Sequence, residues 1–257
     1  MAVRHSHRAA RPSRPTQLPR LPRSSRPSQP SQPSRKGTMK LLLTSAGVTN
    51  ESIRGALVDL LGRPLSEANA LVVPTAVHPM GGPAAAWRVA SGRSRTPLAE
   101  LGWKSLGVLE LTALPSVGRE RWLPWVEEAD ALLLSGGDSL YLAHWMRESG
   151  LAELLPSLEA VVVGVSAGSM VMAPWVGEEF VDWTPPTGGD TALGVVDFAV
   201  FPHLDHPDCP ENSTADAIAW AARLPCPGYA IDDETALRVV DGTVEVVSEG
   251  AWRLLTP

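Results

Sequence analysis

Short apolar runs alternate with amphipathic stretches along the chain from Met39 onward. The runs have the length of buried strands, and the stretches between them repeat their apolar residues with the period of a helix. Such alternation predicts an α/β fold with a mostly parallel, doubly wound sheet that is flanked by helices on both faces. The expected strands are 40–45, 70–74, 106–111, 131–135 and 161–165, and the expected helices are 53–61, 82–91, 138–150 and 213–222.

The rhythm changes after the fifth strand. Residues 173–200 are rich in Pro, Gly and Trp and predict loops, although the apolar run 195–201 predicts one more strand that reaches the same edge of the sheet. Three further β runs are expected at 228–232, 235–240 and 243–248. Asp241 and Gly242 join the last two runs, and Asp-Gly is a strong signal for a two-residue turn. The fold class therefore includes a C-terminal β hairpin.

Charge is divided unevenly along the chain. Residues 1–38 carry +9, with seven Pro, seven Ser and no Asp or Glu, whereas the remaining residues carry −15. A segment with so few large apolar side chains cannot offset the entropy of ordering, so we expect 1–38 to be a disordered basic tail and 39–257 to form one α/β domain. The tail is either an upstream extension ahead of a start at Met39, an arm for nucleic acid or a membrane surface, or an organelle targeting segment.

Several classes of protein are disfavoured by composition. The acidic body argues against nucleic acid as the main ligand, because phosphate binding needs a basic face. No stretch reaches the roughly 20 apolar residues that span a bilayer, and the first residues lack the apolar centre of a secretory signal. We therefore expect a cytoplasmic protein that binds no membrane. Cys209 and Cys226 supply neither a disulfide framework nor a thiolate zinc cluster.

The first candidate for chemistry is Ser166, which lies in the sequence Gly-Val-Ser-Ala-Gly at 164–168. This GxSxG pattern follows three consecutive valines, as a strand-to-helix turn requires. Small flanking residues allow such a turn to hold a serine Oγ above the sheet, close to a helix N-terminus. The pattern predicts a nucleophilic serine, and the alternative is a Gly-rich turn that contains an incidental serine.

Gly136, Gly137 and Asp138 follow the preceding strand, so a parallel sheet places them at the same carboxyl edge as the serine. Backbone amides can approach a developing oxyanion where there is no side chain, and the residue after the nucleophile supplies a second donor. We expect Gly137 and Ala167 to be these donors. Asp138 either caps the next helix or contacts the substrate.

A nucleophilic serine needs a base, and histidine is the usual one. His203 and His206 follow the apolar run 195–201, and His203 is favoured because it comes first after that strand. A metal site is the other interpretation of this segment, but its spacing does not match the helical His-Glu-Xaa-Xaa-His pattern, so we expect no metal. The orienting acid stays open among the nearby carboxylates Glu178, Glu179, Asp182, Asp190, Asp205 and Asp208.

Three features in this order resemble the peptidase E (aspartyl dipeptidase) family of serine peptidases. They are Gly-Gly-Asp at a strand end, Val-Gly-Val-Ser-Ala-Gly-Ser about thirty residues later, and Pro-His a further 37 residues on. The resemblance covers residues 39–250 and implies a fold similar to class I glutamine amidotransferases. It also implies hydrolysis of dipeptides with an N-terminal Asp by a Ser-His-Asp triad, without a metal or cofactor.

Carried onto this chain, the resemblance implies Ser166 as nucleophile, His203 as base and Asp182 as acid. Gly137 and Ala167 are then the oxyanion donors. The chain departs from better-known members by having Gly-Gly-Asp in place of Gly-Gly-Asn and by a second histidine. We expect three further residues to contact the substrate: Gly136, Asp138 and His206. A small acidic peptide would need a basic partner, for which the candidates are Arg88, Arg93, Arg95 and Arg223.

Two other functions stay open. An α/β-hydrolase esterase shares GxSxG, but its histidine usually lies far downstream, whereas only 37 residues separate Ser166 from His203. An amidotransferase would need Cys in place of the serine. A catalytically silent flavodoxin-like module that binds a ligand at the same edge is the remaining alternative. Monomer and homodimer are both compatible with the sequence.

Overall fold

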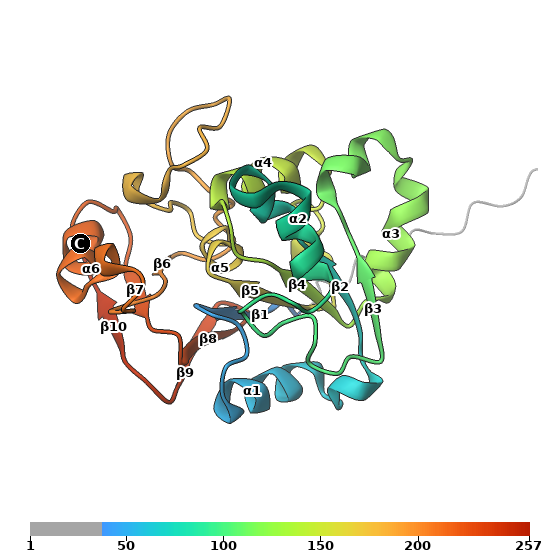
Figure 1. Cartoon of the computed structure of the whole chain (residues 1–257), viewed down its shortest axis with the longest axis horizontal. Helices are drawn as coiled ribbons and strands as arrows, with labels where there is room; N and C mark the ends of the chain where they lie inside the picture. The colour runs from blue at the N-terminus through green and yellow to red at the C-terminus, as the bar shows by residue number, and fades with distance from the viewer. Residues whose placement is uncertain (1–37) are drawn as a thin grey trace, which may run out of the picture. The chain divides into compact units, whose positions relative to one another are not determined.

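A computed structural model describes residues 38–257 and contains a seven-stranded mixed sheet (Figure 1). The strand order is β3-β2-β4-β5-β1-β8-β9. Strands β1 to β5 are mutually parallel, and β8 and β9 complete the sheet as antiparallel strands at one side. Their bounds are Ser105–Val108 (β3), Asn69–Val73 (β2), Ala131–Leu134 (β4), Val161–Val165 (β5), Lys40–Thr44 (β1), Thr235–Val240 (β8) and Thr243–Ser248 (β9).

Helices cover both faces of this sheet. In Figure 1, α1 lies below the strands, α4 lies above them, and α3 lies to their right beside β3. The α-helices are α1 (Glu51–Leu61), α2 (His78–Ala90), α3 (Arg119–Glu128), α4 (Ser139–Glu148), α5 (Ala167–Met170) and α6 (Thr214–Ala221). Short 3-10 helices occupy Leu65–Glu67, Thr75–Val77, Leu111–Ser116, Leu155–Ser157, Glu178–Phe180 and Pro210–Asn212. The predicted α/β class, with a mostly parallel sheet between helices, is confirmed.

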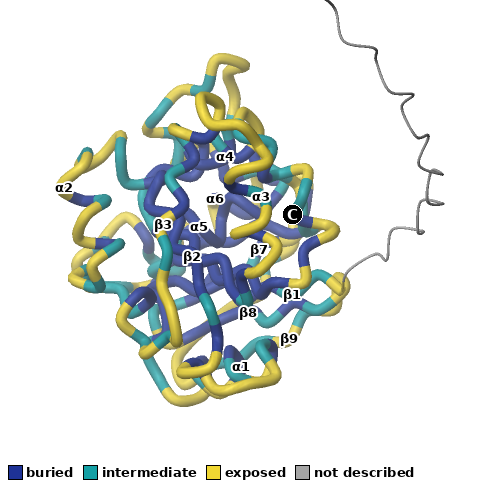
Figure 2. The backbone as a smooth tube through the Cα atoms, turned by 90° about the vertical axis from the view of Figure 1, so that its right-hand side faces the viewer, coloured by how far each residue is buried: buried dark blue, intermediate teal, exposed yellow. Residues whose placement is uncertain are grey.

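Strand β5 shows why the sheet has two apolar faces. All five of its residues are buried. Successive side chains of a strand point to opposite faces, so Val161, Val163 and Val165 pack in the core under α1, while Val162 packs with residues of α3 and α4. Each fully buried valine stabilises the fold by about 1.5–3 kcal/mol. Figure 2 shows this central strand layer as buried, with exposed positions gathered on the surrounding loops and helices.

The C-terminal hairpin is confirmed at the predicted residues, because β8 and β9 pair across Asp241-Gly242. The run before His203 is different from the prediction. Its strand, β6 (Ala199–Phe201), is shorter and belongs to a second sheet of order β10-β7-β6. Strand β7 is Gly228–Ile231, and β10, Trp252–Leu255, was not predicted. Alternation of apolar residues indicates strands but does not show which strands pair. The place beside β1 in the large sheet is taken by β8, and β6 pairs with β7 in the second sheet.

The segment 1–37 lies outside the described residues, so the predicted basic tail is not tested here. The prediction of one domain over 39–257 likewise stays a prediction. Across residues 38–257, every helix falls short of the length and apolarity that a membrane crossing requires.

The close approach of β5 to α5 gives a test of the fold. A Cβ added at Gly164 would lie 2.4 Å from the carbonyl oxygen of Gly168, which is backbone and cannot rotate away. We expect Gly164→Ala to lower the free energy of unfolding by about 1–3 kcal/mol. Urea denaturation of the purified protein measures this change.

The matched control is Gly55→Ala in α1, where an added Cβ meets nothing within 4 Å. Alanine in a helix is favoured over glycine by about 0.5–1 kcal/mol, so this variant should be at least as stable as the parent chain. Equal unfolding midpoints for the two variants would show that the approach of α5 to β5 is looser than described.

Candidate active site

Ser166 lies on a sharp turn at the carboxyl end of β5, between β4 and β1. Its backbone has φ 48° and ψ −109°, a conformation that non-glycine residues rarely adopt. The turn is held in place because its amide donates to the carbonyl of Thr44 at 2.9 Å, while its own carbonyl accepts from Ser169 and Met170 at the start of α5. Such backbone strain persists where the surrounding structure enforces it, and it concentrates at functional sites.

The Gly136-Gly137 turn after β4 lies directly beside this serine. A Cβ built on Gly136 would be 3.5 Å from the Cβ of Ser166. Gly137 has φ 133°, and a Cβ there would lie 2.2 Å from the carbonyl oxygen of Ala76, so only glycine fits. Within residues 38–257, the amides of Gly137 and Ala167 donate to no acceptor. Both expected oxyanion donors are therefore free to bind a ligand atom at this edge.

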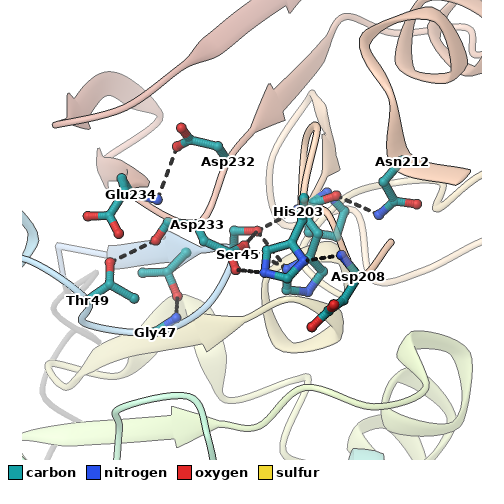
Figure 3. A network of polar contacts seen from close by, with 12 residues as sticks. Ser45, Gly47, Thr49, His203, Asp208, Asn212, Asp232, Asp233 and Glu234 are labelled. Atoms are coloured by element: carbon teal, nitrogen blue, oxygen red, sulfur yellow. Dashed lines mark hydrogen bonds and ion pairs between the residues drawn. The ribbon is translucent and has the colours of Figure 1, made fainter. Parts of the chain in front are cut away.

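His203 follows β6 and reaches the site through a cluster of short polar contacts (Figure 3). Its φ is 57°, and its amide donates to Oγ of Ser45 at 2.6 Å. Its Nδ1 lies 2.7 Å from Oδ1 of Asp233, and Ser45 Oγ donates to the same carboxylate oxygen at 3.0 Å. The imidazole is thus oriented through Nδ1 by a carboxylate, with its second nitrogen left for other partners.

The carboxylate at Nδ1 is therefore Asp233, and the prediction that Asp182 faces His203 is wrong. Asp182 lies in the wall of the cavity described below. Asp233 stands two residues before β8, and β8 runs antiparallel to β1. An antiparallel strand begins at the sheet edge where the neighbouring parallel strands end. Asp233 therefore lies at the same edge as the carboxyl ends of β1 and β5.

Five other carboxylates were considered for this position. Asp190 accepts from the amide of Gly177 at 3.1 Å, and Asp205 accepts from the amide and hydroxyl of Thr214 at the start of α6. Glu179 forms an ion pair with Arg223. Glu178 is exposed at the start of a 3-10 helix. The backbone amide of Asp208 donates to Nδ1 of His206 at 3.1 Å. Among the described residues, no hydrogen bond or ion pair joins the side chain of any of these five residues to His203.

Sequence reasoning missed Ser45 and Asp233. Ser45 directly follows β1, and the run Asp232-Asp233-Glu234 directly precedes the hairpin. Three consecutive acidic residues before an antiparallel strand were the available signal. Only the pairing of β8 with β1 shows that this run arrives at the serine's edge.

Gly136, Asp138 and His206 were expected to contact a substrate. Gly136 is not among the residues that line the cavity described below. Asp138 is 3% exposed, and it caps α4 by accepting from the amide of Tyr141 at 2.8 Å. Its other oxygen accepts from the amide of Trp183 at 2.7 Å, which fastens the loop after β5 to the start of α4. Nε2 of His206 lies 3.5 Å from Oδ2 of Asp233, so this second histidine flanks the same carboxylate instead of lining the cavity.

A cavity of about 700 Å³ brings these groups together. Ser166, His203, Gly137 and Asp138 all line it. Within residues 38–257, no hydrogen bond joins Ser166 Oγ to His203. Across the same residues, no three His, Cys, Asp or Glu side chains form a group suited to a metal ion. The arrangement provides a serine, an oriented imidazole and the amide of Gly137 around one cavity, and the amide of Ala167 directly follows the serine.

The surroundings of Asp233 also change its acidity. Burial raises the pKa of this carboxyl, but hydrogen bonds from His203 and Ser45 and the charges of His203 and His206 outweigh burial, and the pKa is lowered from its ordinary value. The native state therefore favours the ionised carboxylate more than the unfolded chain does. A lowered native pKa stabilises the fold above the unfolded pKa of about 3.9. That stabilisation is lost as pH falls through the native pKa.

The predicted loss of stability at low pH can be tested by unfolding the protein in urea at several pH values between 7 and 3. We expect the parent chain to lose stability as pH falls below about 4, and Asp233→Asn to lose less over the same interval because its side chain cannot be protonated. Asp59→Asn, on the exposed side of α1, removes the same charge and should keep the parent slope. Identical slopes for the Asp233→Asn variant and the parent would contradict the assignment.

Comparison with known proteins agrees with the fold. Residues 41–247 match the sequence profile of Peptidase family S51. A crystal structure of a peptidase E protein from Listeria monocytogenes EGD-e is 16% identical, with TM-score 0.58, and the match covers 83% of this chain and 100% of that chain. A peptidase from an acI-B1 Actinobacterium is 18% identical, with TM-score 0.55, covering 86% and 96%. Among curated proteins, none matches this chain.

The two solved structures show the shared fold, and the sequence profile spans most of the chain that surrounds Ser166 and His203. The resemblance to peptidase E that the motifs indicated is confirmed. With that match over residues 41–247, this chain belongs to Peptidase family S51 and is a serine peptidase.

Proposed function

We propose that this chain hydrolyses short peptides through an acyl-enzyme, with Ser166 as nucleophile, His203 as general base and Asp233 as the orienting acid. One observation carries the proposal: a serine on a strained turn shares a cavity with a histidine whose Nδ1 is held by a carboxylate at 2.7 Å. The free amides of Gly137 and Ala167 complete the machinery as donors to the oxyanion.

In the first half of the reaction, Ser166 Oγ attacks the scissile carbonyl carbon and Nε2 of His203 takes the hydroxyl proton. The carbonyl oxygen becomes an oxyanion that the amides of Gly137 and Ala167 stabilise, each contributing about 10²–10³ in rate. The imidazolium then gives its proton to the leaving nitrogen as the C–N bond breaks. The products of this half are the free amine and a serine ester.

In the second half, water attacks the ester carbon while Nε2 of His203 accepts its proton. The C–O bond to Ser166 breaks as the imidazolium returns that proton to Oγ. The acid product leaves, and every group regains its starting protonation state. The chemistry requires one histidine to act alternately as base and acid.

Asp233 makes this alternation possible. A carboxylate at Nδ1 keeps that nitrogen protonated, which leaves Nε2 as the acceptor, and it stabilises the imidazolium when it forms. Ser45 supports the same geometry, because its hydroxyl donates a hydrogen bond to Asp233 and accepts one from the backbone amide of His203. The missing contact between Ser166 and His203 is compatible with this role, since catalytic hydrogen bonds are often long until substrate binds.

The size of the cavity supports a small substrate. Sites for small molecules commonly enclose about 300–1,000 Å³, and this cavity encloses about 700 Å³. The resemblance implies an N-terminal Asp on the substrate, which would need a cation to receive it. Arg88, Arg93 and Arg95 do not line the cavity. Arg223 does, but it is paired with Glu179. The proposal therefore does not include a requirement for Asp.

A direct test uses labelling and turnover together. A fluorophosphonate probe should modify Ser166, and a panel of dipeptides should be cleaved to free amino acids. Ser166→Ala should abolish labelling and lower kcat by about 10³-fold or more, because the nucleophile is removed. Turnover of a p-nitrophenyl ester without any peptide cleavage would favour an esterase, and absence of both labelling and turnover would favour a silent module.

The assignment of the acid has its own test. Asp233→Asn keeps the shape of the side chain but permits the wrong tautomer of His203, so we expect kcat to fall by about 10³–10⁴-fold. Asp59→Asn, an equal change of charge on the exposed side of α1, should retain parental kcat. Parental activity in the Asp233→Asn variant would exclude this carboxylate from the reaction.

A further inference from the structure

The catalytic cavity is lined mainly by negative charge. Its wall includes five carboxylates and a single guanidinium, that of Arg223. The carboxylates are Asp138, Glu179, Asp182, Glu211 and Asp216. A cavity that contains this imbalance is a poor receptor for an acidic side chain and a good one for a cation.

Three of these carboxylates already have partners. Asp138 accepts two backbone amides, and Asp216 accepts the amide and hydroxyl of Ser213 in the capping box of α6. Glu179 is paired with Arg223, and this ion pair neutralises the guanidinium of the wall. The cation that could have received an acidic substrate is thus compensated by the protein itself.

Asp182 and Glu211 are different. Both are exposed and line the cavity. Within residues 38–257, no hydrogen bond or ion pair engages either side chain. They come from separate segments, since Asp182 lies in the loop after β5 and Glu211 in the 3-10 helix Pro210–Asn212 just after His203. Two uncommitted carboxylates therefore border the cavity that holds Ser166 and the base.

The electrostatic effect of these residues is felt by other groups in the wall. Burial raises the pKa of Asp138, and the charge of Asp182 raises it further, against the hydrogen bonds that lower it. Burial also raises the pKa of the Cys209 thiol, and the charges of Glu211, Asp233 and Asp208 add to that rise. Burial sets the direction of both pKa shifts, and the neighbouring carboxylate charges add to it in the same direction.

We propose that the peptide substrate of this enzyme carries a basic side chain, Lys or Arg, next to the scissile bond, and that Asp182 and Glu211 receive its charge. The inference rests on the peptidase function proposed above and specifies its substrate class. An N-terminal ammonium group would benefit from the same carboxylates. An N-terminal Asp would instead place a carboxylate among five others, and like charges brought together in this way oppose binding.

The test compares kcat/KM for Lys-Leu, Leu-Lys, Leu-Leu and Asp-Leu with the full-length enzyme at low salt. We expect kcat/KM for at least one lysine peptide to be higher than kcat/KM for Leu-Leu, and higher than that for Asp-Leu by about tenfold or more. Added NaCl should reduce the advantage of that lysine peptide, because exposed charge pairs are screened, and should leave Leu-Leu largely unchanged. The salt response is read on the unmodified chain and needs no variant.

The residues are tested by Asp182→Asn, Glu211→Gln and the double variant. Each single change should lower the preference for lysine over Leu-Leu by about two- to fivefold, as expected for loss of one exposed charge partner. Glu159→Gln is the matched control, since it removes one negative charge at an exposed position outside the cavity. Labelling of Ser166 by a fluorophosphonate confirms that each variant retains a folded site.

The outcomes separate the two proposals. A lysine preference that falls in the Asp182 and Glu211 variants but not in Glu159→Gln supports the inference. Four results would overturn it. They are cleavage of Asp-Leu as fast as or faster than the lysine peptides, equal rates for all four peptides, labelling of Ser166 without cleavage of either lysine peptide, or a lysine preference that both variants retain. In the first two of these cases the peptidase function stands. Absence of both labelling and cleavage refutes the proposed function, and this inference with it.

Discussion

The antiparallel pairing of β8 with β1 is the constraint on which the site depends. Parallel strands bring their carboxyl ends to one edge, and this places Ser45 after β1, Gly136-Gly137 after β4 and Ser166 after β5 in a row. None of those ends supplies a carboxylate to the imidazole. Because β8 runs in the opposite direction, with Thr44 opposite Ala236, its beginning arrives at the same edge and delivers Asp233 to His203. A parallel strand in that place would begin at the far edge of the sheet.

Of the four non-glycine residues with positive φ among the described residues, two are the residues that must meet in the reaction. Ser166 and His203 both have positive φ, at 48° and 57°, and neither is glycine. Conformations of this kind cost of order 1–3 kcal/mol each and persist only where the surroundings enforce them. Here the surroundings are specific: the carbonyl of Thr44 holds the serine turn, and the hydroxyl of Ser45 holds the histidine backbone. The end of β1 therefore fixes both sides of the site from one short segment.

Much of the fold was predictable because it rests on local signals. Buried strands such as β5, the hairpin across Asp241-Gly242 and the turn around Ser166 each have their causes within a few residues of chain. His203 was found for the same reason, as the first histidine after an apolar run. The second sheet and the true partner of His203 were not found, since both depend on which distant strands lie together. Asp182 was preferred on its distance along the chain, whereas Asp233 is placed by a pairing about 190 residues apart.

The bond from Asp138 to the amide of Trp183 has a practical consequence for altering this enzyme. It anchors the loop through the backbone, one residue beyond Asp182, so the loop does not depend on the side chain at position 182 for its attachment. That position can accept a different residue while the wall stays where it is. The bond from Asp138 to the Trp183 amide thus shapes the cavity wall, while the side chain at position 182 is the group proposed to recognise the substrate. A redesign can therefore change the residue at position 182 without rebuilding the wall.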